Sequence, residues 1–312
     1  MKAGKVRKKV LALLLAGTAI LGLTGGGTMQ VEAAGQENAY VDTSSYEQLY
    51  KLYEDYFKLG IACQAMDHWN DPTAEIGNQE KEELINRMFN SMTFGNELKP
   101  AYNFDASSEN LFKVDFAAEE MLEWAKENNM KVRGHVLVWH SQVDPSIFAI
   151  DYQAYADGKL TKSDTAKLDE ECLVDREELL ARLKRYIYGV LEYTYKNGYA
   201  DVIYAWDVVN EAADENQYDG LRRSYWYQII GPDYLYYAFL YAREAETLYA
   251  KQYASLYGLD ADTDDLSSIQ PKLFYNDYNE WFGSRSDAII HFLTEEPWNE
   301  NHEKVKSSVI NP

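Results

Sequence analysis

The sequence predicts an α/β fold in which helices cover a parallel sheet. Three observations predict it: apolar runs of strand length alternate with amphipathic helical stretches, the runs are apolar on both alternating faces, and polar residues gather where each run ends. Runs that are apolar on both faces are typical of strands buried on both sides of a parallel sheet. The chain has 312 residues, 46% of them hydrophobic, which is sufficient for a substantial core.

The alternation starts at residue 45 and makes a repeated βα unit. The longest helical stretch opens at Asp175, whose carboxylate suits a helix cap, with glutamates in the first turn. The predicted helices span residues 45–57, 81–89, 114–129, 175–198, a stretch that begins at 232, and 285–293. The predicted strands lie in residues 60–66, 91–100, 131–142, 201–211 and 271–281. No low-complexity linker follows residue 40, so residues 45–312 are expected to form one domain.

Polar side chains end four of these runs. They are Asn96, Glu97 and Lys99; His135, Trp139 and Gln142; Asn210 and Glu211; and Asn276, Asp277 and Tyr278. A (β/α)8 TIM barrel and an open doubly wound sheet both gather their chemistry at this edge. Because the chain contains neither a GxGxxG nor a GxxxxGK[ST] phosphate loop, nucleotide binding is disfavoured. A barrel that acts on a carbohydrate or a similar neutral substrate is the better interpretation.

Residues 1–34 have the layout of a secretory signal peptide. A basic head is followed by the apolar "VLALLLAGTAILGL" and by a small-residue exit, with cleavage expected near Ala33 or Ala34. The alternative, an uncleaved membrane anchor, is disfavoured because the unbroken apolar run falls short of a bilayer-spanning length. We therefore expect a secreted, extracellular protein that has no membrane contact after cleavage.

The negative charge of the chain disfavours anionic partners. The net charge is −21, and an acidic surface of this kind repels nucleic acid and anionic membranes.

The cysteines and the aromatic residues carry further expectations. Cys63 and Cys172 provide neither a disulfide framework nor a Cys-rich metal site, and we expect two structural thiols. Most of the 26 tyrosines are explained by core-facing helix faces, and a minority near strand ends are candidates for stacking on sugars.

Four motifs in order carry a family resemblance. "GNELKP" at 95–100, "GHVLVWHSQ" at 134–142, "WDVVNEA" at 206–212 and "LFYNDYN" at 273–279 closely resemble the family 10 glycoside hydrolases. These are secreted endo-β-1,4-xylanases on a TIM barrel, and the resemblance runs from about residue 45 to about 293. It implies retaining hydrolysis of internal bonds in xylan or xylo-oligosaccharides, with no cofactor and by a monomer when the protein is full length.

The resemblance also implies roles for individual residues. Glu211 matches the acid/base, and Asn210 would hydrogen-bond the 2-hydroxyl of the sugar. Sugars on the donor side would be held by Asn96, Lys99, His135, Trp139 and Gln142, and Asn276 and Tyr278 would line the scissile bond and the acceptor side. For each residue a structural alternative stands beside this role, such as barrel packing for Trp139. His140 is expected to support Trp139, and a metal site at the two histidines is disfavoured because HExxH-type spacing is absent.

Two departures from the family pattern stand out. Gly95 replaces a carboxylate that typically contacts sugar. The glutamate nucleophile of an "ITELD"-like strand end is not found, because Glu295 continues a helical stretch and Pro297 follows it. The chain holds about five of eight βα units, so it is expected to be truncated before the nucleophile strand. The full-length product is expected to hydrolyse xylan, whereas this chain alone is expected to be inactive.

Several alternatives remain open at this point. A cellulase or mannanase barrel also carries an Asn-Glu pair at its fourth strand, although "GNELKP" and "GHVLVWHSQ" favour xylan. The missing nucleophile is also compatible with a non-catalytic xylan-binding remnant, a gene fragment, or pairing with a separately encoded C-terminal piece. A structural Ca²⁺ held by loop carboxylates is a further possibility.

Overall fold

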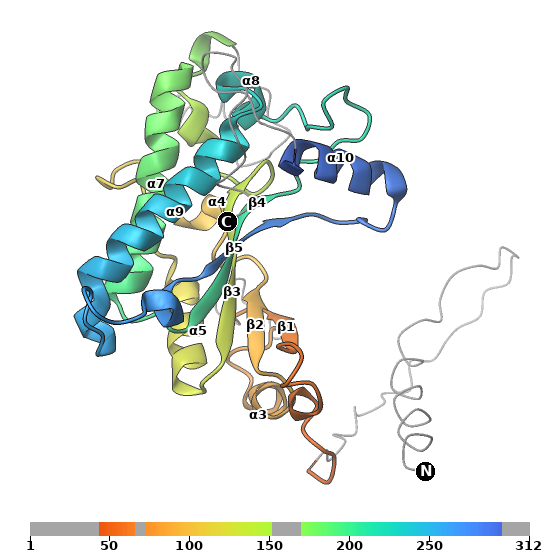
Figure 1. The fold of residues 1–312 in the computed structure, drawn as a ribbon, viewed down its shortest axis with the longest axis vertical. Coiled ribbons are helices and arrows are strands. Elements are labelled where there is room, and N and C mark those ends of the chain that lie inside the picture. Colours follow the sequence, from red (N-terminus) through yellow and green to blue (C-terminus); the bar gives the residue numbers. More distant parts are fainter. Residues whose placement is uncertain (1–43, 66–72, 152–169, 295–312) are drawn as a thin grey trace, which may run out of the picture. The chain divides into compact units, whose positions relative to one another are not determined.

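The structure is a computed structural model that describes residues 44–65, 73–151 and 170–294 (Figure 1). Almost all of these residues belong to one compact unit, which spans residues 46–312. The predicted signal peptide and Glu295 lie outside the described residues. Within the described ranges, no helix is long and apolar enough to span a bilayer.

Five parallel strands form one sheet in their order along the chain. They are β1 (Gly60–Cys63), β2 (Ser91–Phe94), β3 (Lys131–Trp139), β4 (Ile203–Asn210) and β5 (Lys272–Asn276). Every connection between neighbouring strands contains helix, as is usual for the crossovers of parallel strands. The predicted α/β class, with about five βα units, is confirmed, and all five strands begin within the predicted runs.

The helices lie where the amphipathic stretches predict them, with one exception. The longer helices are α3 (Gln79–Met88), α5 (Phe116–Glu127), α7 (Arg176–Lys196), α9 (Tyr234–Tyr253) and α10 (Gly283–Thr294). The short ones are α4 (Pro100–Asn103), α8 (Tyr225–Ile230), η1 (Tyr50–Leu52), η2 (Pro145–Phe148), η3 (Glu170–Cys172), η4 (Ala254–Tyr257) and η5 (Leu266–Ile269). Asp175 caps α7 as predicted, because its carboxylate accepts a hydrogen bond from the Glu178 amide at 2.9 Å.

The prediction of a helix over residues 45–57 is wrong. Only the single 3-10 turn η1 forms there. Large apolar side chains of residues 45–57 stay exposed, Tyr46, Tyr56 and Phe57 among them. Burial therefore does not offset the cost of nucleating a helix here. The spacing of apolar residues predicted a helical face that has no buried surface to pack on.

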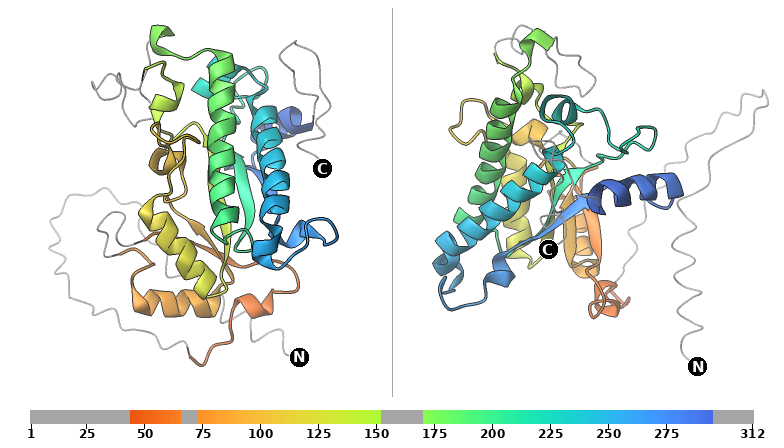
Figure 2. Two further views of the ribbon diagram at one scale, coloured as in Figure 1. Left: turned by 90° about the vertical axis from the view of Figure 1, so that its left-hand side faces the viewer. Right: turned by 45° about the horizontal axis from the view of Figure 1, so that its top comes forward.

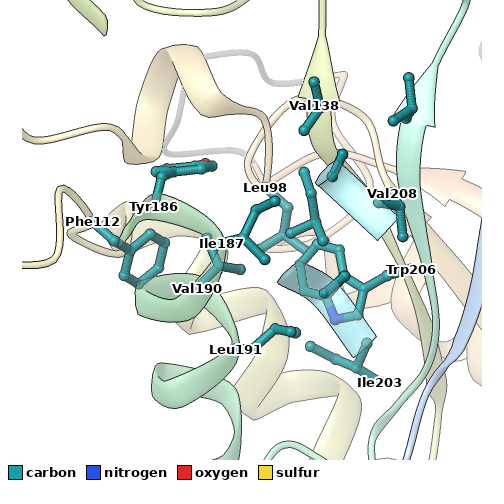
Figure 3. Packing of buried hydrophobic residues seen from close by; sticks show 14 of the residues in the cluster. Leu98, Phe112, Val138, Tyr186, Ile187, Val190, Leu191, Ile203, Trp206 and Val208 are labelled. Atoms are coloured by element: carbon teal, nitrogen blue, oxygen red, sulfur yellow. The ribbon is translucent and has the colours of Figure 1, made fainter. Parts of the chain in front are cut away.

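The core lies between the sheet and the helices α7 and α9, which run side by side over one face (Figures 1 and 2). Trp206 of β4 is buried and points toward Ile187, Val190 and Leu191 of α7 (Figure 3). Gly134 of β3 lies against the same indole, and an added Cβ would be 2.3 Å from a ring carbon of Trp206. Glycine is therefore required in β3 for the largest core side chain to fit.

Both cysteines are free thiols, as predicted. Cys63, at the end of β1, is buried, and Cys172 is partly buried. Burial raises the pKa of Cys63 to about 12, and the carboxylates of Glu75 and Glu97 add to this shift. The Cys63 thiol is therefore protonated at neutral pH and serves as a small apolar core group.

We expect the substitution Gly134→Ala to destabilise the fold by about 2–3 kcal/mol, because the new methyl group overpacks the Trp206 ring. Urea unfolding followed by tryptophan fluorescence measures this as a lower midpoint. Gly283→Ala is the matched control: its added Cβ meets no atom within 4 Å, so its effect should stay within about 0.5 kcal/mol. Equal midpoints for the two variants would contradict the packing described here.

Candidate active site

The carboxyl ends of β2, β3, β4 and β5 bring most of the predicted site residues together. The first group lies after β2 and β3. The Lys99 ammonium donates to Asn96 Oδ1 at 2.8 Å and to Gln142 Oε1 at 2.6 Å, and Gln142 Nε2 donates to Asn96 Oδ1 at 2.9 Å. These three side chains form a closed triangle, so each holds the other two in place.

Lys99 is itself a buried cation in this group. Burial lowers the pKa of its ammonium below the ordinary value, and the nearby carboxylates of Glu97 and Glu211 act in the opposite direction. The Lys99 ammonium also lies 5.0 Å from the centre of the Trp139 ring, within the range of a cation–π contact. It therefore links the triangle to the end of β3.

Trp139 connects this triangle to Glu211. Its indole Nε1 donates to Glu211 Oε2 at 3.1 Å, and its carbonyl accepts from Trp226 Nε1 at 3.0 Å. The rings of His135 and His140 each lie 5.9 Å from the Trp139 ring, and His140 meets it edge-on, which fits the supporting position expected for His140. The Trp139 indole thus fixes one carboxylate oxygen of Glu211, and Trp139 is itself positioned by Trp226, His135 and His140.

The backbone at Glu211 is turned sharply away from β4. Glu211 has φ of 53°, in the left-handed region that costs a residue other than glycine about 1–2 kcal/mol. Its amide donates to the Asn276 carbonyl at 2.8 Å, and its own carbonyl accepts from Arg222 Nε at 3.0 Å. Contacts on both sides of the peptide hold this conformation and direct the carboxylate toward Trp139.

A second group of side chains centres on Asp207 in β4, which is 1% exposed. Asp207 Oδ1 accepts from Arg133 Nε at 2.9 Å and from its terminal nitrogen at 2.6 Å, and Oδ2 lies 2.9 Å from His135 Nδ1. Arg133 also donates to Asn276 Oδ1 at 2.9 Å, and Asn276 Nδ2 donates to Asn210 Oδ1 at 2.8 Å. A continuous chain of hydrogen bonds therefore runs from His135 to Asn210.

Irregular strand pairing accompanies this group. The register between β3 and β4 shifts between His135 and Val138, and the register between β4 and β5 shifts between Asp207 and Val209. Such bulges re-aim side chains near the ends of strands. Here the shifts lie between the buried Asp207 group and the strand ends that carry Trp139 and Asn210.

Tyr278 is the one predicted site residue that lies on the neighbouring loop rather than in these two groups. Tyr278 is 44% exposed, and the centre of its ring lies 4.1 Å from the Arg285 guanidinium carbon. Arg285 in turn donates to Asp277 Oδ1 at 2.6 Å. The Tyr275 hydroxyl donates to the same aspartate and accepts from the Ala213 amide, so the loop after β5 is tied to the loop after β4.

Comparison with known proteins identifies the family. The family model for glycosyl hydrolase family 10 matches residues 48–301. The chain belongs to glycosyl hydrolase family 10. Endo-1,4-beta-xylanase A of Thermotoga maritima is 36% identical over 246 residues, covering 78% of this chain and 18% of the relative. Exoglucanase XynX of Acetivibrio thermocellus is 34% identical over 247 residues, with the same coverages of 78% and 18%.

A solved xylanase structure is also similar to this chain. The intracellular xylanase of Thermoanaerobacterium saccharolyticum, determined as a Glu→Ala mutant in complex with xylotetraose, matches with a TM-score of 0.56 and 32% identity. The match covers 78% of this chain and 61% of that one. The chain therefore spans about three fifths of this solved structure and about a fifth of the length of the two relatives named above. The predicted (β/α)8 class is confirmed, with five parallel strands among the described residues.

The departure at Gly95 has a local explanation. An added Cβ at this position would lie 2.7 Å from Gln64 Cγ and 2.9 Å from Gln64 Nε2. The side chain of Gln64, which follows β1, therefore fills the space beside Gly95. Any larger residue at Gly95 needs Gln64 to move.

Sequence reasoning did not assign a role to Arg133, Asp207 or Glu97. Glu97 is fully buried, and its carboxylate accepts from the amides of Ala65 at 3.0 Å and Asn96 at 2.9 Å. A charged residue inside an otherwise apolar strand, as in "YAWDVVN", is the signal that indicates Asp207. Among the described residues, no group of three or more His, Cys, Asp or Glu side chains is placed to hold a metal ion.

We expect Asp207→Asn to destabilise the fold by about 2–3 kcal/mol, because the amide removes the charge that Arg133 is paired with and cannot accept from both partners as the carboxylate does. Urea unfolding measures the loss. Asp201→Asn, at an exposed position just before β4, serves as the control and should change stability by less than about 0.5 kcal/mol. If Asp207→Asn were as stable as the control, Asp207 would not organise the site.

Proposed function

We propose that this site is the acid/base half of a retaining endo-1,4-β-xylanase. The observation that carries the proposal is the placement of Glu211. It lies at the end of β4, next to Asn210, and its carboxylate accepts a hydrogen bond from the Trp139 indole. Cleaving a glycosidic bond requires a proton for the departing oxygen, and a carboxyl group held at a strand end can supply it. The described contacts leave Glu211 Oε1 as the oxygen that would face the glycosidic bond.

Asn210 is proposed to act on the sugar ring that undergoes cleavage. Its Oδ1 accepts from Asn276 at 2.8 Å, so its amide nitrogen is the atom that would donate to a sugar hydroxyl. Because Asn276 is itself held by Arg133, the orientation of Asn210 is set before substrate arrives. A hydrogen bond to the 2-hydroxyl of the sugar that strengthens in the transition state contributes directly to rate.

The donor side of the substrate is proposed to lie over the ends of β2 and β3. There Asn96, Lys99 and Gln142 present polar atoms, and the Trp139 ring presents an apolar face beside His135. A pyranose needs both, because its C–H face is apolar while its hydroxyls need hydrogen-bond partners. Xylan and xylo-oligosaccharides are the proposed ligands.

The second carboxylate of a retaining pair is proposed to come from outside the described residues. Two carboxylates are roughly 5–5.5 Å apart in such enzymes. The buried carboxylates of Glu97 and Asp207 are both engaged, the first by two backbone amides and the second by Arg133 and His135. Neither is available to attack a sugar carbon, so we propose that the described residues bind substrate but do not turn it over by themselves.

A β-glucan is the second candidate substrate. The specific observation in its favour is the similarity to a relative named exoglucanase. Since the chain alone is proposed not to turn substrate over, affinities separate the two candidates: tighter binding of cellotriose than of xylotriose in a calorimetric titration would overturn the choice of xylan.

Secretion is proposed from the layout of residues 1–34, with a basic head, an apolar middle and a small-residue exit. A secreted protein should carry a new amino terminus just after Ala33 or Ala34. Mass spectrometry of protein from the culture medium tests this. An intact leader on exported protein, or retention of the protein inside the cell, would contradict it.

We expect Glu211→Gln to lower kcat on xylan about 10²–10⁴-fold, because the amide cannot donate the proton that the leaving oxygen needs. The assay uses a chimera in which the last three βα units of the Thermoanaerobacterium saccharolyticum xylanase follow β5 and its helix α10, so that a second carboxylate is supplied. On an aryl xylobioside with an acidic phenol leaving group, Glu211→Gln should lose much less activity, because the phenolate departs without needing a proton.

Tyr56→Ala, at an 82% exposed position before β1, is the control for the chimera and should keep the full rate. Equal losses on xylan and on the activated aryl substrate would contradict the acid role. Glu211→Gln should still bind xylotriose within about threefold of the parent chain, since the amide oxygen can accept from Trp139 as the carboxylate does.

A further inference from the structure

The loop between β4 and α8 carries the most exposed tyrosine of the described residues near the site. Tyr218 is 91% exposed. The loop is closed by an isolated bridge between Ala213 and Leu221, and the Asp214 amide donates to the Gly220 carbonyl at 2.8 Å. Tyr218 therefore projects from a hydrogen-bonded loop that begins only two residues after Glu211.

The Tyr218 ring rests on a fixed cation. The Arg223 guanidinium carbon lies 5.2 Å from the centre of the Tyr218 ring and 4.1 Å from that of Tyr227. Asp219 holds this guanidinium at 2.9 Å and accepts from the Tyr227 hydroxyl at 2.6 Å. Burial alone would raise the pKa of Asp219, but the hydrogen bonds from Tyr227 and Arg223 lower it below its ordinary value, so the Asp219 carboxyl stays ionised.

The same arrangement recurs in the next loop. Tyr278 rests on Arg285, whose guanidinium carbon is 4.1 Å from the ring centre, and Asp277 holds that guanidinium at 2.6 Å. Each tyrosine thus has a guanidinium on one side and exposed ring surface, and each arginine is neutralised by an aspartate. One loop follows Glu211 and the other follows Asn276, so both begin at the proposed site.

The two loops are joined to each other. Arg285 donates to Glu215 at 2.7 Å and to the Ala213 carbonyl at 3.1 Å. Gly220 lies so close to Ala288 of α10 that an added Cβ would be 3.0 Å from the alanine methyl. These contacts hold the Tyr218 loop against the element that follows Tyr278, so the positions of the two rings are coupled.

The chemistry of these rings fits a neutral, flat ligand. The arginine charges are matched by carboxylates, which removes the attraction that a phosphate or an acidic peptide would need. An exposed aromatic face with polar groups at its edge suits the apolar C–H face of a pyranose, which stacks on aromatic rings. The proposed donor residues lie at the ends of β2 and β3, whereas Tyr218 follows β4, in the loop after Glu211, and Tyr278 follows β5, so both tyrosines come later in the sheet order than the donor residues.

We propose that Tyr218, held on Arg223, is a stacking platform for the leaving-group portion of a β-1,4-linked pyranose chain, beyond the sugar that contacts Tyr278. This inference rests on the proposed function, because Glu211 defines which end of the chain departs. It assigns the loop after β4 a role in preferring long substrates over short ones. A short oligosaccharide that fills only the centre of the site does not reach Tyr218.

Calorimetric titration of the chain with xylobiose and with xylohexaose tests the platform. Tyr218→Ala is expected to weaken xylohexaose binding about five- to tenfold and to leave xylobiose binding within about twofold. Tyr218→Phe keeps the ring and should bind xylohexaose like the parent chain. Tyr56→Ala, which removes another highly exposed tyrosine, before β1, should change neither affinity.

The possible outcomes separate the platform from the proposed function. Unchanged xylohexaose binding by Tyr218→Ala overturns the platform while leaving the xylan site in place. Equal weakening of both sugars, or a loss in Tyr218→Phe as large as in Tyr218→Ala, also overturns it, because the effect would then come from the loop or the hydroxyl rather than from stacking. Failure of the parent chain to bind either sugar contradicts the proposed function itself, and the platform with it.

Discussion

The buried carboxylate of Asp207 is the constraint on which the rest of the site depends. A charge that is 1% exposed is tolerated only when its oxygens are fully engaged, and Arg133 and His135 provide that engagement. Through Arg133 the constraint extends to Asn276 and from there to Asn210. One buried charge in β4 thus fixes side chains from three neighbouring strands, and the Asn210 amide is oriented as a consequence.

The parallel sheet explains why these side chains meet. Consecutive strands end at one edge, so residues far apart in the sequence, such as Lys99, Trp139 and Glu211, become neighbours there. The left-handed backbone at Glu211 shows that this placement has an energetic cost, which hydrogen bonds on both sides of the peptide offset. Stability of the sheet and geometry of the site are therefore not independent properties of this molecule.

Much of the fold, and the gathering of polar residues at one edge of the sheet, was predictable from the sequence, because the signals were local. Apolar runs predicted five strands, and the cap at Asp175 predicted the start of the longest helix. The helix predicted over residues 45–57 failed because its apolar face has no buried surface to pack on, which periodicity cannot reveal. The link from Arg133 to Asn276 spans 143 residues and depends on the bulged register of β3 and β4, so the sequence alone did not predict it.

The most direct test of the account is a crystal structure of the chain soaked with xylotetraose. The account predicts one sugar ring with its 2-hydroxyl within hydrogen-bond distance of the Asn210 amide nitrogen, and the Glu211 carboxyl beside a glycosidic oxygen. The donor-side rings should lie over the Trp139 indole and the Lys99 ammonium. A sugar bound elsewhere on the chain, or bound at this edge with Glu211 turned away from every glycosidic oxygen, would contradict it.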